Sequence, residues 1–126
     1  MGGFMPQSVV LLAKDPHVAQ SLLGGLRSHF HAVLVTGSCE ELHDRVERDQ
    51  PEAVVFDIES SRLSDVAALH RDFPSLPIVC THRIPDEDIW MAALDAGASD
   101  VCPASDVQDV LTSVLRNMAL ARSAAA

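Results

Sequence analysis

The chain has little of the positive charge that nucleic-acid binding requires. Its 126 residues contain 18 Asp and Glu against 9 Lys and Arg, for a net charge of −9, and Lys14 is its only lysine. No basic run or basic helix is present, although a phosphate backbone is bound by clustered Lys and Arg. We therefore expect no direct nucleic-acid partner.

Cysteines and long apolar runs are also scarce. Cys39, Cys80 and Cys102 are an odd number with no CxxC spacing, which is typical of reduced thiols in the cytosol and not of a disulfide framework. The apolar runs fall far short of the ~20 residues that a membrane-spanning helix needs. The first residues, MGGFMPQ, have neither the charged nor the apolar region of a signal peptide. We expect a cytoplasmic protein with no membrane partner.

Short apolar runs alternate with longer periodic segments along the whole chain. Strands are predicted at 8–13, 32–36, 53–57, 76–80 and 99–102, because these runs are short and rich in β-branched residues. Helices are predicted after Asp15, Ser38, Arg62, Pro85 and Ser105, from capping residues, acidic first turns and apolar stripes. We place one domain at 8–120, an N-terminal extension at 1–7 and a tail or linker start at 121–126.

Five strand-then-helix units predict an α/β fold with a five-stranded parallel sheet and helices on both faces. The default strand order for such a chain is the flavodoxin-like 2-1-3-4-5. Sites in these sheets form at the carboxyl ends of the strands, near the switch point between the first and third strands. That geometry selects residues 13–15, 57–59, 81–82 and 103–104.

Three segments, in this order and spacing, resemble the receiver domain of bacterial response regulators. They are the opening Leu11–Pro16, the apolar strand that ends at Asp57, and the Ala96–Asp100 stretch AGASD. The resemblance covers about residues 8 to 120. It implies a (βα)5 receiver fold and a role in phosphorelay signal transduction, in which an aspartate accepts a phosphoryl group from a phospho-histidine. Because an anion then approaches an anion, cations and hydrogen-bond donors must neutralise the developing charge.

One half of the site that the resemblance implies holds Mg²⁺. Asp57 stands at the phospho-acceptor position. The acidic pair after the first strand falls on Ala13 and Lys14, which are degenerate, and Asp15 and Glu59 are the acids that remain nearby. Mg²⁺ requires an octahedral oxygen shell anchored by carboxylates, and an ammonium repels it. We expect no cofactor, or a weakly bound Mg²⁺ held by Asp15, Asp57 and Glu59.

The other half contacts the phosphoryl group. The switch hydroxyl position falls on His82, or on Thr81 if the loop differs by one residue. The lysine position falls on Ala104, or on Pro103 if shifted, and that lysine is lost because none follows Lys14. The resemblance therefore implies the degenerate, pseudo-receiver variant of the family, with impaired phosphorylation.

We interpret the chain as an atypical receiver domain that is not an enzyme and acts mainly as a protein-interaction and dimerisation module. The partners implied are a histidine kinase or a fused or downstream effector, and a second copy bound through the face of the fourth helix, fifth strand and last helix. The first alternative is a functional two-component receiver phosphorylated on Asp57. The second is a flavodoxin-like small-ligand binder, although no Gly-rich phosphate loop follows the first strand.

Four side chains near the predicted site have two interpretations each. Lys14 replaces the metal as the counter-charge of Asp57, or it points to solvent. His82 donates to Asp57, or it faces water. Cys80 and Cys102 approach as a redox pair, or, as we expect, they are small core residues.

Two further patterns bear on partners and metals. Trp90 and Met91 form an exposed contact patch, or they pack along their own helix. The six histidines show no HxxxH or HExxH spacing, so we expect no zinc site.

Overall fold

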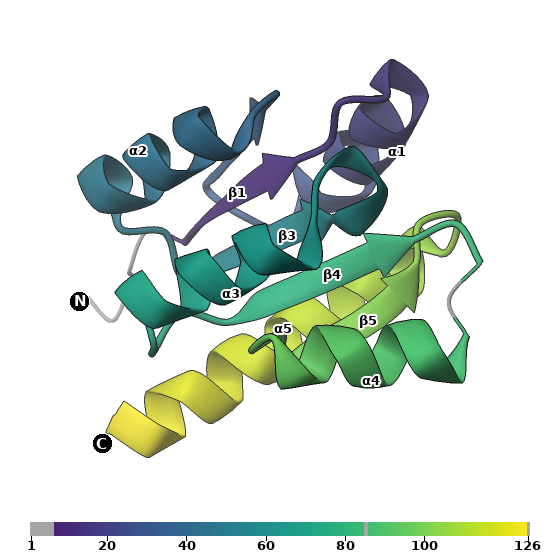
Figure 1. Cartoon of the computed structure of the whole chain (residues 1–126). Helices are drawn as coiled ribbons and strands as arrows, with labels where there is room; N and C mark the ends of the chain where they lie inside the picture. The colour runs from purple at the N-terminus through teal and green to yellow at the C-terminus, as the bar shows by residue number, and fades with distance from the viewer. Residues whose placement is uncertain (1–6, 85, 126) are drawn as a thin grey trace.

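The computed structural model describes residues 7–84 and 86–125, in which strands alternate with helices (Figure 1). The strands are β1 (Ser8–Leu12), β2 (Ala32–Thr36), β3 (Ala53–Asp57), β4 (Ile78–His82) and β5 (Asp100–Pro103). The helices are α1 (Pro16–Leu26), α2 (Cys39–Asp49), α3 (Leu63–Asp72), α4 (Glu87–Asp95) and α5 (Val107–Ala125), with a short 3-10 turn, η1 (Ile58–Ser60), after β3. All strand pairs are parallel, and the order β2-β1-β3-β4-β5 confirms the predicted flavodoxin-like order.

The sheet separates two apolar cores. On one face, side chains of α1 and α5 pack on Val9, Leu11 and Val55. On the other face, side chains of α2, α3 and α4 pack on alternate strand residues such as Leu12 and Phe56 (Figure 1). A parallel sheet covered on both faces needs strands that are apolar on both sides, and all five residues of β3 are buried. A fully buried Leu, Val or Phe side chain contributes about 1.5–3 kcal/mol by leaving water, so this central strand is a firm support for Asp57.

β4 begins two residues later than predicted, at Ile78. Pro77 has no N–H to give to the sheet, and its carbonyl oxygen accepts from the Val54 amide at 3.0 Å instead. β1 ends one residue early and β5 is shifted by one residue, whereas β2 and β3 match their predicted ranges. The shift of β4 matters for function because it places Thr81 and His82 within the strand.

The start of α5 also differs from the prediction. Asp106, and not Ser105, precedes the first helical residue, and its carboxylate accepts from the Asp109 amide at 3.1 Å. Both residue types cap helices well, so the sequence alone left a one-residue choice. α5 then continues to Ala125, beyond the residue 120 at which we placed the end of the domain.

Two glycines serve close packing. A Cβ on Gly25 of α1 would lie 1.9 Å from Cγ1 of Val107, so the glycine allows α1 and α5 to approach. Gly97, after α4, has φ +111°, and a Cβ there would lie 2.4 Å from the His70 ring. This conformation is one that glycine adopts at helix ends at low cost.

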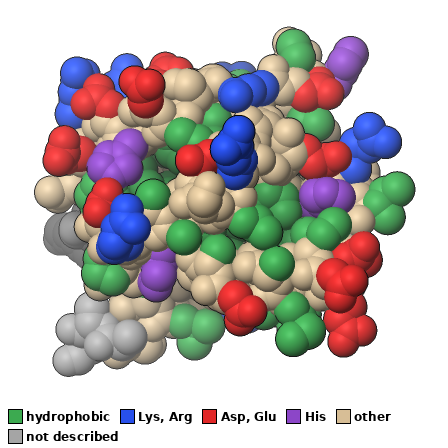
Figure 2. Space-filling view, viewed as in Figure 1, with side chains coloured by type: hydrophobic (Ala, Val, Ile, Leu, Met, Phe, Trp, Pro, Cys, Tyr) green, Lys and Arg blue, Asp and Glu red, His purple; other side chains and the backbone are tan. Residues whose placement is uncertain are grey.

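Figure 2 shows the face covered by α2, α3 and α4, where acidic side chains gather at the start of α4. Asp86 caps this helix by accepting from the Ile89 amide at 2.9 Å, and Glu87 and Asp88 occupy the first turn. Carboxylates at a helix N-terminus interact favourably with its dipole. These acids therefore have a structural role at the start of α4.

Candidate functional site

A pocket of about 520 Å³ lies at the carboxyl ends of β1 and β3. It is lined by Lys14, Asp15, Val18, Asp57, Glu59, Ser60 and Arg83. Four of the residues that the sequence selected, Lys14, Asp15, Asp57 and Glu59, therefore lie together. Ser60 and Arg83 also line the pocket, and the sequence analysis had not singled out either residue.

Asp57 ends β3 and is 3% exposed. Both of its carboxylate oxygens have a protein donor. The hydroxyl of Thr81 donates to Oδ1 at 3.2 Å, and the hydroxyl of Ser60 donates to Oδ2 at 2.9 Å. Thr81 pairs with Asp57 in the β3–β4 register, and η1 turns Ser60 back toward the end of β3.

Burial raises the pKa of the Asp57 carboxyl above its ordinary value, because the charged form is poorly solvated there. The hydrogen bonds from Ser60 and Thr81 oppose this effect by stabilising the carboxylate, and the charge of Glu59 adds to it. Desolvation is the largest of these causes. Asp57 is thus held less acidic than a surface aspartate.

Lys14 contributes its backbone, and not its ammonium, to the site. Its N–H donates to the Ser60 hydroxyl at 2.8 Å. The exposed side chain makes no ion pair with Asp57 within the described ranges, whose salt bridges involve other cations. Of the two interpretations of Lys14, the structure therefore favours the one in which its side chain points to solvent, and the donors to Asp57 are the hydroxyls of Ser60 and Thr81.

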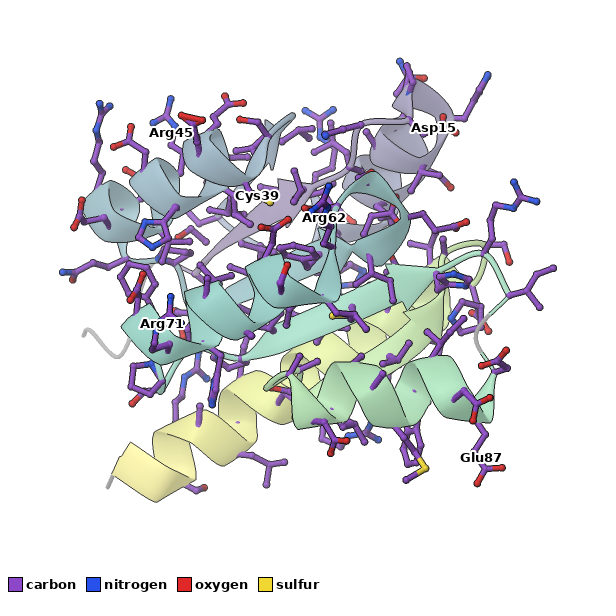
Figure 3. The ribbon with its side chains drawn as sticks, viewed as in Figure 1. Asp15, Cys39, Arg45, Arg62, Arg71 and Glu87 are labelled. Carbon is purple, nitrogen blue, oxygen red and sulfur yellow. The ribbon has the colours of Figure 1, made fainter. Side chains whose placement is uncertain are left out.

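The other two acids at the pocket are engaged by backbone donors. Asp15 caps α1 and accepts from the His17 amide at 2.8 Å (Figure 3). Glu59 accepts from the Arg83 amide at 2.7 Å and so links η1 to the loop after β4. Ala13 is 4% exposed and offers only a methyl group where a carboxylate would be needed.

These observations fit poorly with a resident Mg²⁺. The ion is held by carboxylates and keeps several waters, whereas Asp15, Asp57 and Glu59 already accept hydrogen bonds from the protein. Over residues 7–84 and 86–125, no three His, Cys, Asp or Glu side chains are grouped so that they could hold a metal ion.

Thr81 and His82 are neighbours in β4 but have different contacts. Thr81 is fully buried and contacts Asp57. His82 Nδ1 lies 3.2 Å from the Ile84 amide and accepts from it, so this nitrogen serves the loop after β4. At the lost lysine position, Pro103 pairs with His82 across β4 and β5, and the buried Ala104 donates its N–H to the His82 carbonyl at 2.9 Å.

Cys80 and Cys102 are core residues, as expected. Both are buried free thiols, but Cys80 belongs to the core under α2, α3 and α4, and Cys102 belongs to the core under α1 and α5. Because they lie on opposite faces of the sheet, the redox-pair interpretation is wrong. Burial raises the pKa of each thiol to about 12.

A second polar cluster lies beside the site, between the starts of α2 and α3. The Ser61 hydroxyl bonds to the Asp65 carboxylate and lies 2.8 Å from Cys39 Sγ. Cys39 and Arg62 are labelled in Figure 3, near the segment that leads into α3. Burial raises the pKa of the Cys39 thiol, which disfavours the reactive thiolate.

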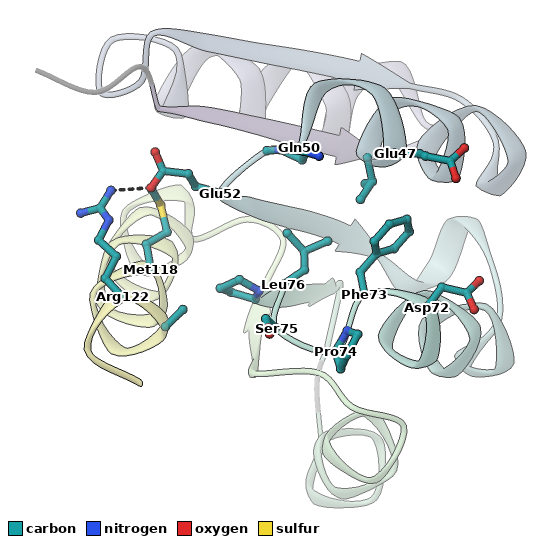
Figure 4. Close-up of a pocket in the computed structure, with 14 residues that line it drawn as sticks. Glu47, Gln50, Glu52, Asp72, Phe73, Pro74, Ser75, Leu76, Met118 and Arg122 are labelled. Carbon is teal, nitrogen blue, oxygen red and sulfur yellow. Dashed lines mark hydrogen bonds and ion pairs between the residues drawn. The ribbon is translucent and has the colours of Figure 1, made fainter. Parts of the chain in front are cut away.

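A larger pocket, of about 620 Å³, lies at the opposite edge of the sheet (Figure 4). Apolar side chains such as Phe73, Leu76 and Met118 line it, together with Glu47, and Arg122 forms an ion pair with Glu52 beside it. No residue that the sequence selected as a site residue belongs to this pocket. Pocket size alone therefore does not locate the predicted chemistry.

Exposed apolar side chains lie on α4 and α5. On α4, Trp90 is 45% exposed and Met91 is 53% exposed, as the contact-patch interpretation required. On α5, Leu115 and Leu120 are also exposed. Within the described part of the chain, no helix is both long and apolar enough to cross a membrane.

Solved structures that resemble this chain include response regulator receiver domains. A response regulator from Thermotoga maritima matches with a TM-score of 0.82 at 15% identity, over 91% of this chain and 99% of that chain. The N-terminal signal receiver domain of a two-component response regulator from Bacteroides fragilis matches with a TM-score of 0.81 at 22% identity, over 90% and 98%. A CheY-like receiver domain protein from Methanospirillum hungatei matches with a TM-score of 0.83 at 14% identity, over 94% and 98%. The chain therefore has the response regulator receiver fold.

Sequence comparison is less informative than structure. No family model matches the chain. The chain is 26% identical over 101 residues to the protein-glutamate methylesterase/protein-glutamine glutaminase of group 3 operon from Rhodopseudomonas palustris. The match covers 75% of this chain and 28% of that protein, so the chain spans less than a third of this curated relative.

Proposed function

We propose that the chain is an atypical receiver domain in bacterial signal transduction, acting mainly as a cytoplasmic protein-interaction and dimerisation module with impaired Mg-dependent phosphorylation. The observation that carries this proposal is the state of Asp57. It is 3% exposed, and the hydroxyls of Ser60 and Thr81 donate to its two oxygens. Each carboxylate oxygen therefore has a donor within the protein, and burial lowers the share of the charged, nucleophilic form at a given pH.

The residues after β1 support the same proposal. Ala13 and Lys14 occupy the positions at which the resemblance implies an acidic pair, and Lys14 adds a positive charge to the pocket. In phosphoryl transfer, catalysis consists mainly of positioning and charge neutralisation. A pocket that lacks both acids of this pair and the later lysine is poorly equipped for either task.

The proposed output is protein contact. The candidate surface is the α4–β5–α5 face, where Trp90, Met91 and Leu115 are exposed. Aromatic and Met side chains are enriched in protein interfaces. A second copy of the chain, a histidine kinase or a fused or downstream effector is the partner we propose, and no catalytic activity of its own is needed.

Incubation with Mg²⁺ and acetyl phosphate, followed by intact mass measurement, tests this function. In the reaction tested, an Asp57 oxygen attacks phosphorus, the bond from phosphorus to the acetyl oxygen breaks, and acetate leaves with the electron pair. We expect no phosphoryl adduct on the wild-type chain. An adduct that disappears in Asp57→Asn would contradict the proposal.

The second candidate function is a working phospho-acceptor, which one observation favours. Asp57, Asp15 and Glu59 line one pocket, so three carboxylates lie near the acceptor even without the acidic pair. In that case the same incubation yields an adduct on wild type and none on Asp57→Asn. The two candidates therefore give opposite results in one experiment.

A further inference from the structure

Ser60 is the residue at which two loops of the site meet. Its hydroxyl accepts from the Lys14 amide at 2.8 Å and donates to Asp57 Oδ2 at 2.9 Å. Lys14 belongs to the loop after β1, and Ser60 ends the η1 turn after β3. One side chain therefore connects the backbone of the first loop to the carboxylate at the end of the central strand.

Of the two residues that donate to Asp57, Ser60 is the one that also lines the pocket. Thr81 donates to Oδ1 and is fully buried, whereas Ser60 donates to Oδ2 and lines the pocket. A buried carboxylate is costly unless it is hydrogen-bonded or paired with a cation. No cationic side chain contacts Asp57 in the described part of the chain, so the Ser60 hydroxyl supplies the stabilisation at Oδ2.

We infer that Ser60 is a positioning residue of this site: its hydroxyl donates to Asp57, which no cationic side chain contacts in the described residues, and it links the β1–α1 and β3–α3 loops. This inference rests on the proposed function, because it explains how the loops keep one arrangement without phosphorylation. The loss of the acidic pair alone does not explain what fixes the loops, and the contacts of Ser60 do. A group that displaced the Ser60 hydroxyl from Oδ2 would also disturb its hydrogen bond to the loop after β1.

The neighbouring groups do not share this role. The Ser61 hydroxyl is turned to the Asp65 carboxylate and to Cys39 Sγ. Glu59 accepts from the Arg83 amide and so ties η1 to the loop after β4. Within the described residues, the contact between Ser60 and Lys14 is the hydrogen bond that joins the β1–α1 loop to η1. This division makes Ser61 a matched control in the adjacent position.

Two measurements on the folded protein test the role of Ser60. Hydrogen exchange by NMR follows the Lys14 amide, which loses its acceptor in Ser60→Ala. We expect that amide to exchange about fivefold to tenfold faster, the factor that corresponds to one ordinary hydrogen bond. The carboxyl carbon resonance of Asp57 at neutral pH provides a second signature, and it should move in Ser60→Ala because Oδ2 loses its donor. Ser60→Thr keeps a hydroxyl and should restore both readouts, and Ser61→Ala should leave both unchanged.

The inference is overturned if Ser60→Ala folds and leaves the Lys14 exchange rate and the Asp57 resonance as in wild type. It is equally overturned if Ser61→Ala causes the same changes, because the effect would then be general loosening of the loop. Ser60→Gly also lacks the hydroxyl, and loss of the fold in both hydroxyl-free variants would likewise overturn the inference, because Ser60 would then support the whole fold and not position this site. Failure of the proposed function is seen separately, as an Asp57 adduct on the wild-type chain with the exchange results unaffected.

Discussion

The hydroxyl of Thr81 lies 3.2 Å from Oδ1 of Asp57, across paired positions of β3 and β4. This contact joins two neighbours in the sheet, and the threonine is fully buried. The family resemblance placed the switch hydroxyl at His82, or at Thr81 if the loop differs by one residue. In this chain the Thr81 hydroxyl therefore contacts Asp57 from within β4, which fixes its position. His82 instead accepts a hydrogen bond from the loop after β4.

Replacing Asp57 by Asn should stabilise the fold at neutral pH. The pKa of Asp57 is raised above its ordinary value of 3.8, mainly by burial. As pH rises above that value, the unfolded chain releases this proton before the folded chain does, so the stability of the wild type falls through the window between the two pKa values. Urea unfolding of both proteins across acidic to neutral pH should show an advantage of Asp57→Asn that grows with pH. A constant difference over that range would contradict the stated effect of burial on Asp57.

Replacing Thr81 by Val removes the hydroxyl while keeping the shape of the side chain. Because a buried charged acceptor loses its donor, we expect a loss of about 1–3 kcal/mol in the free energy of unfolding at neutral pH. Thr112→Val is the control, since its exposed hydroxyl bonds only to the Gln108 carbonyl within α5. Equal losses in the two variants, measured by urea unfolding, would count against a specific contact between Thr81 and Asp57.

The two adjacent glycines of α1 should respond in opposite directions to alanine. A Cβ on Gly25 would lie 1.9 Å from Val107 Cγ1, so Gly25→Ala should destabilise the fold by about 1–3 kcal/mol through overpacking. Nothing lies within 4 Å of a Cβ on Gly24, and Gly24→Ala should be neutral or stabilise the helix by up to about 1 kcal/mol. Denaturant midpoints measure both effects. A Gly25→Ala variant as stable as Gly24→Ala would show that α1 and α5 pack less closely.

The thiols of Cys80 and Cys102 should be inert in the native protein. Alkylation requires the thiolate, and burial raises the pKa of both thiols to about 12. Iodoacetamide at mildly alkaline pH should modify neither residue until denaturant is added, and peptide mass mapping locates any label. A disulfide between Cys80 and Cys102 in the native protein would contradict their positions on opposite faces of the sheet.

Trp90→Glu should weaken self-association if the α4–β5–α5 face is the dimer surface. A charge in place of an exposed aromatic side chain disfavours burial in an interface. Val35→Glu is the matched control, because Val35 is also exposed, at 40%, but lies on β2 at the far edge of the sheet. Light scattering over a range of concentrations should show a dimer for wild type and Val35→Glu, and a monomer for Trp90→Glu. A monomer in all three cases would reject the proposed dimer.

The fold was largely predictable because each strand is a short apolar run and α1, α2, α4 and α5 each begin after a residue whose side chain caps the helix. The strand order, the ranges of β2 and β3 and the start of α3 agree with the sequence-based expectation. The start of β4 was misplaced because Pro77 is apolar in the pattern but cannot donate to the sheet. Periodicity reports burial, and it carries no information about which backbone groups find partners.

The site was predictable in its residues and less so in its contacts. The positions of Asp57, Asp15 and Glu59 around one pocket follow from the rule that parallel strands end at one edge. Ser60 was missed because its role depends on the η1 turn, which brings a side chain three residues later back onto the carboxylate. A hydroxyl three residues after a strand-ending aspartate was the available signal. The direction of the Lys14 side chain had no comparable signal, because the spacing of residues in the sequence does not fix where a long, exposed side chain points.

Mg²⁺ binding at Asp57 is the central question, and an NMR titration of the wild-type chain with MgCl₂ addresses it directly. Because Ala13 offers a methyl group, Lys14 carries a positive charge, and Asp57 is held by two hydroxyls, we expect no saturable change at the amides of residues 14, 57 and 60 in excess Mg²⁺. Saturable shifts at these three amides, absent in Asp57→Asn, would contradict the account and identify a working metal site.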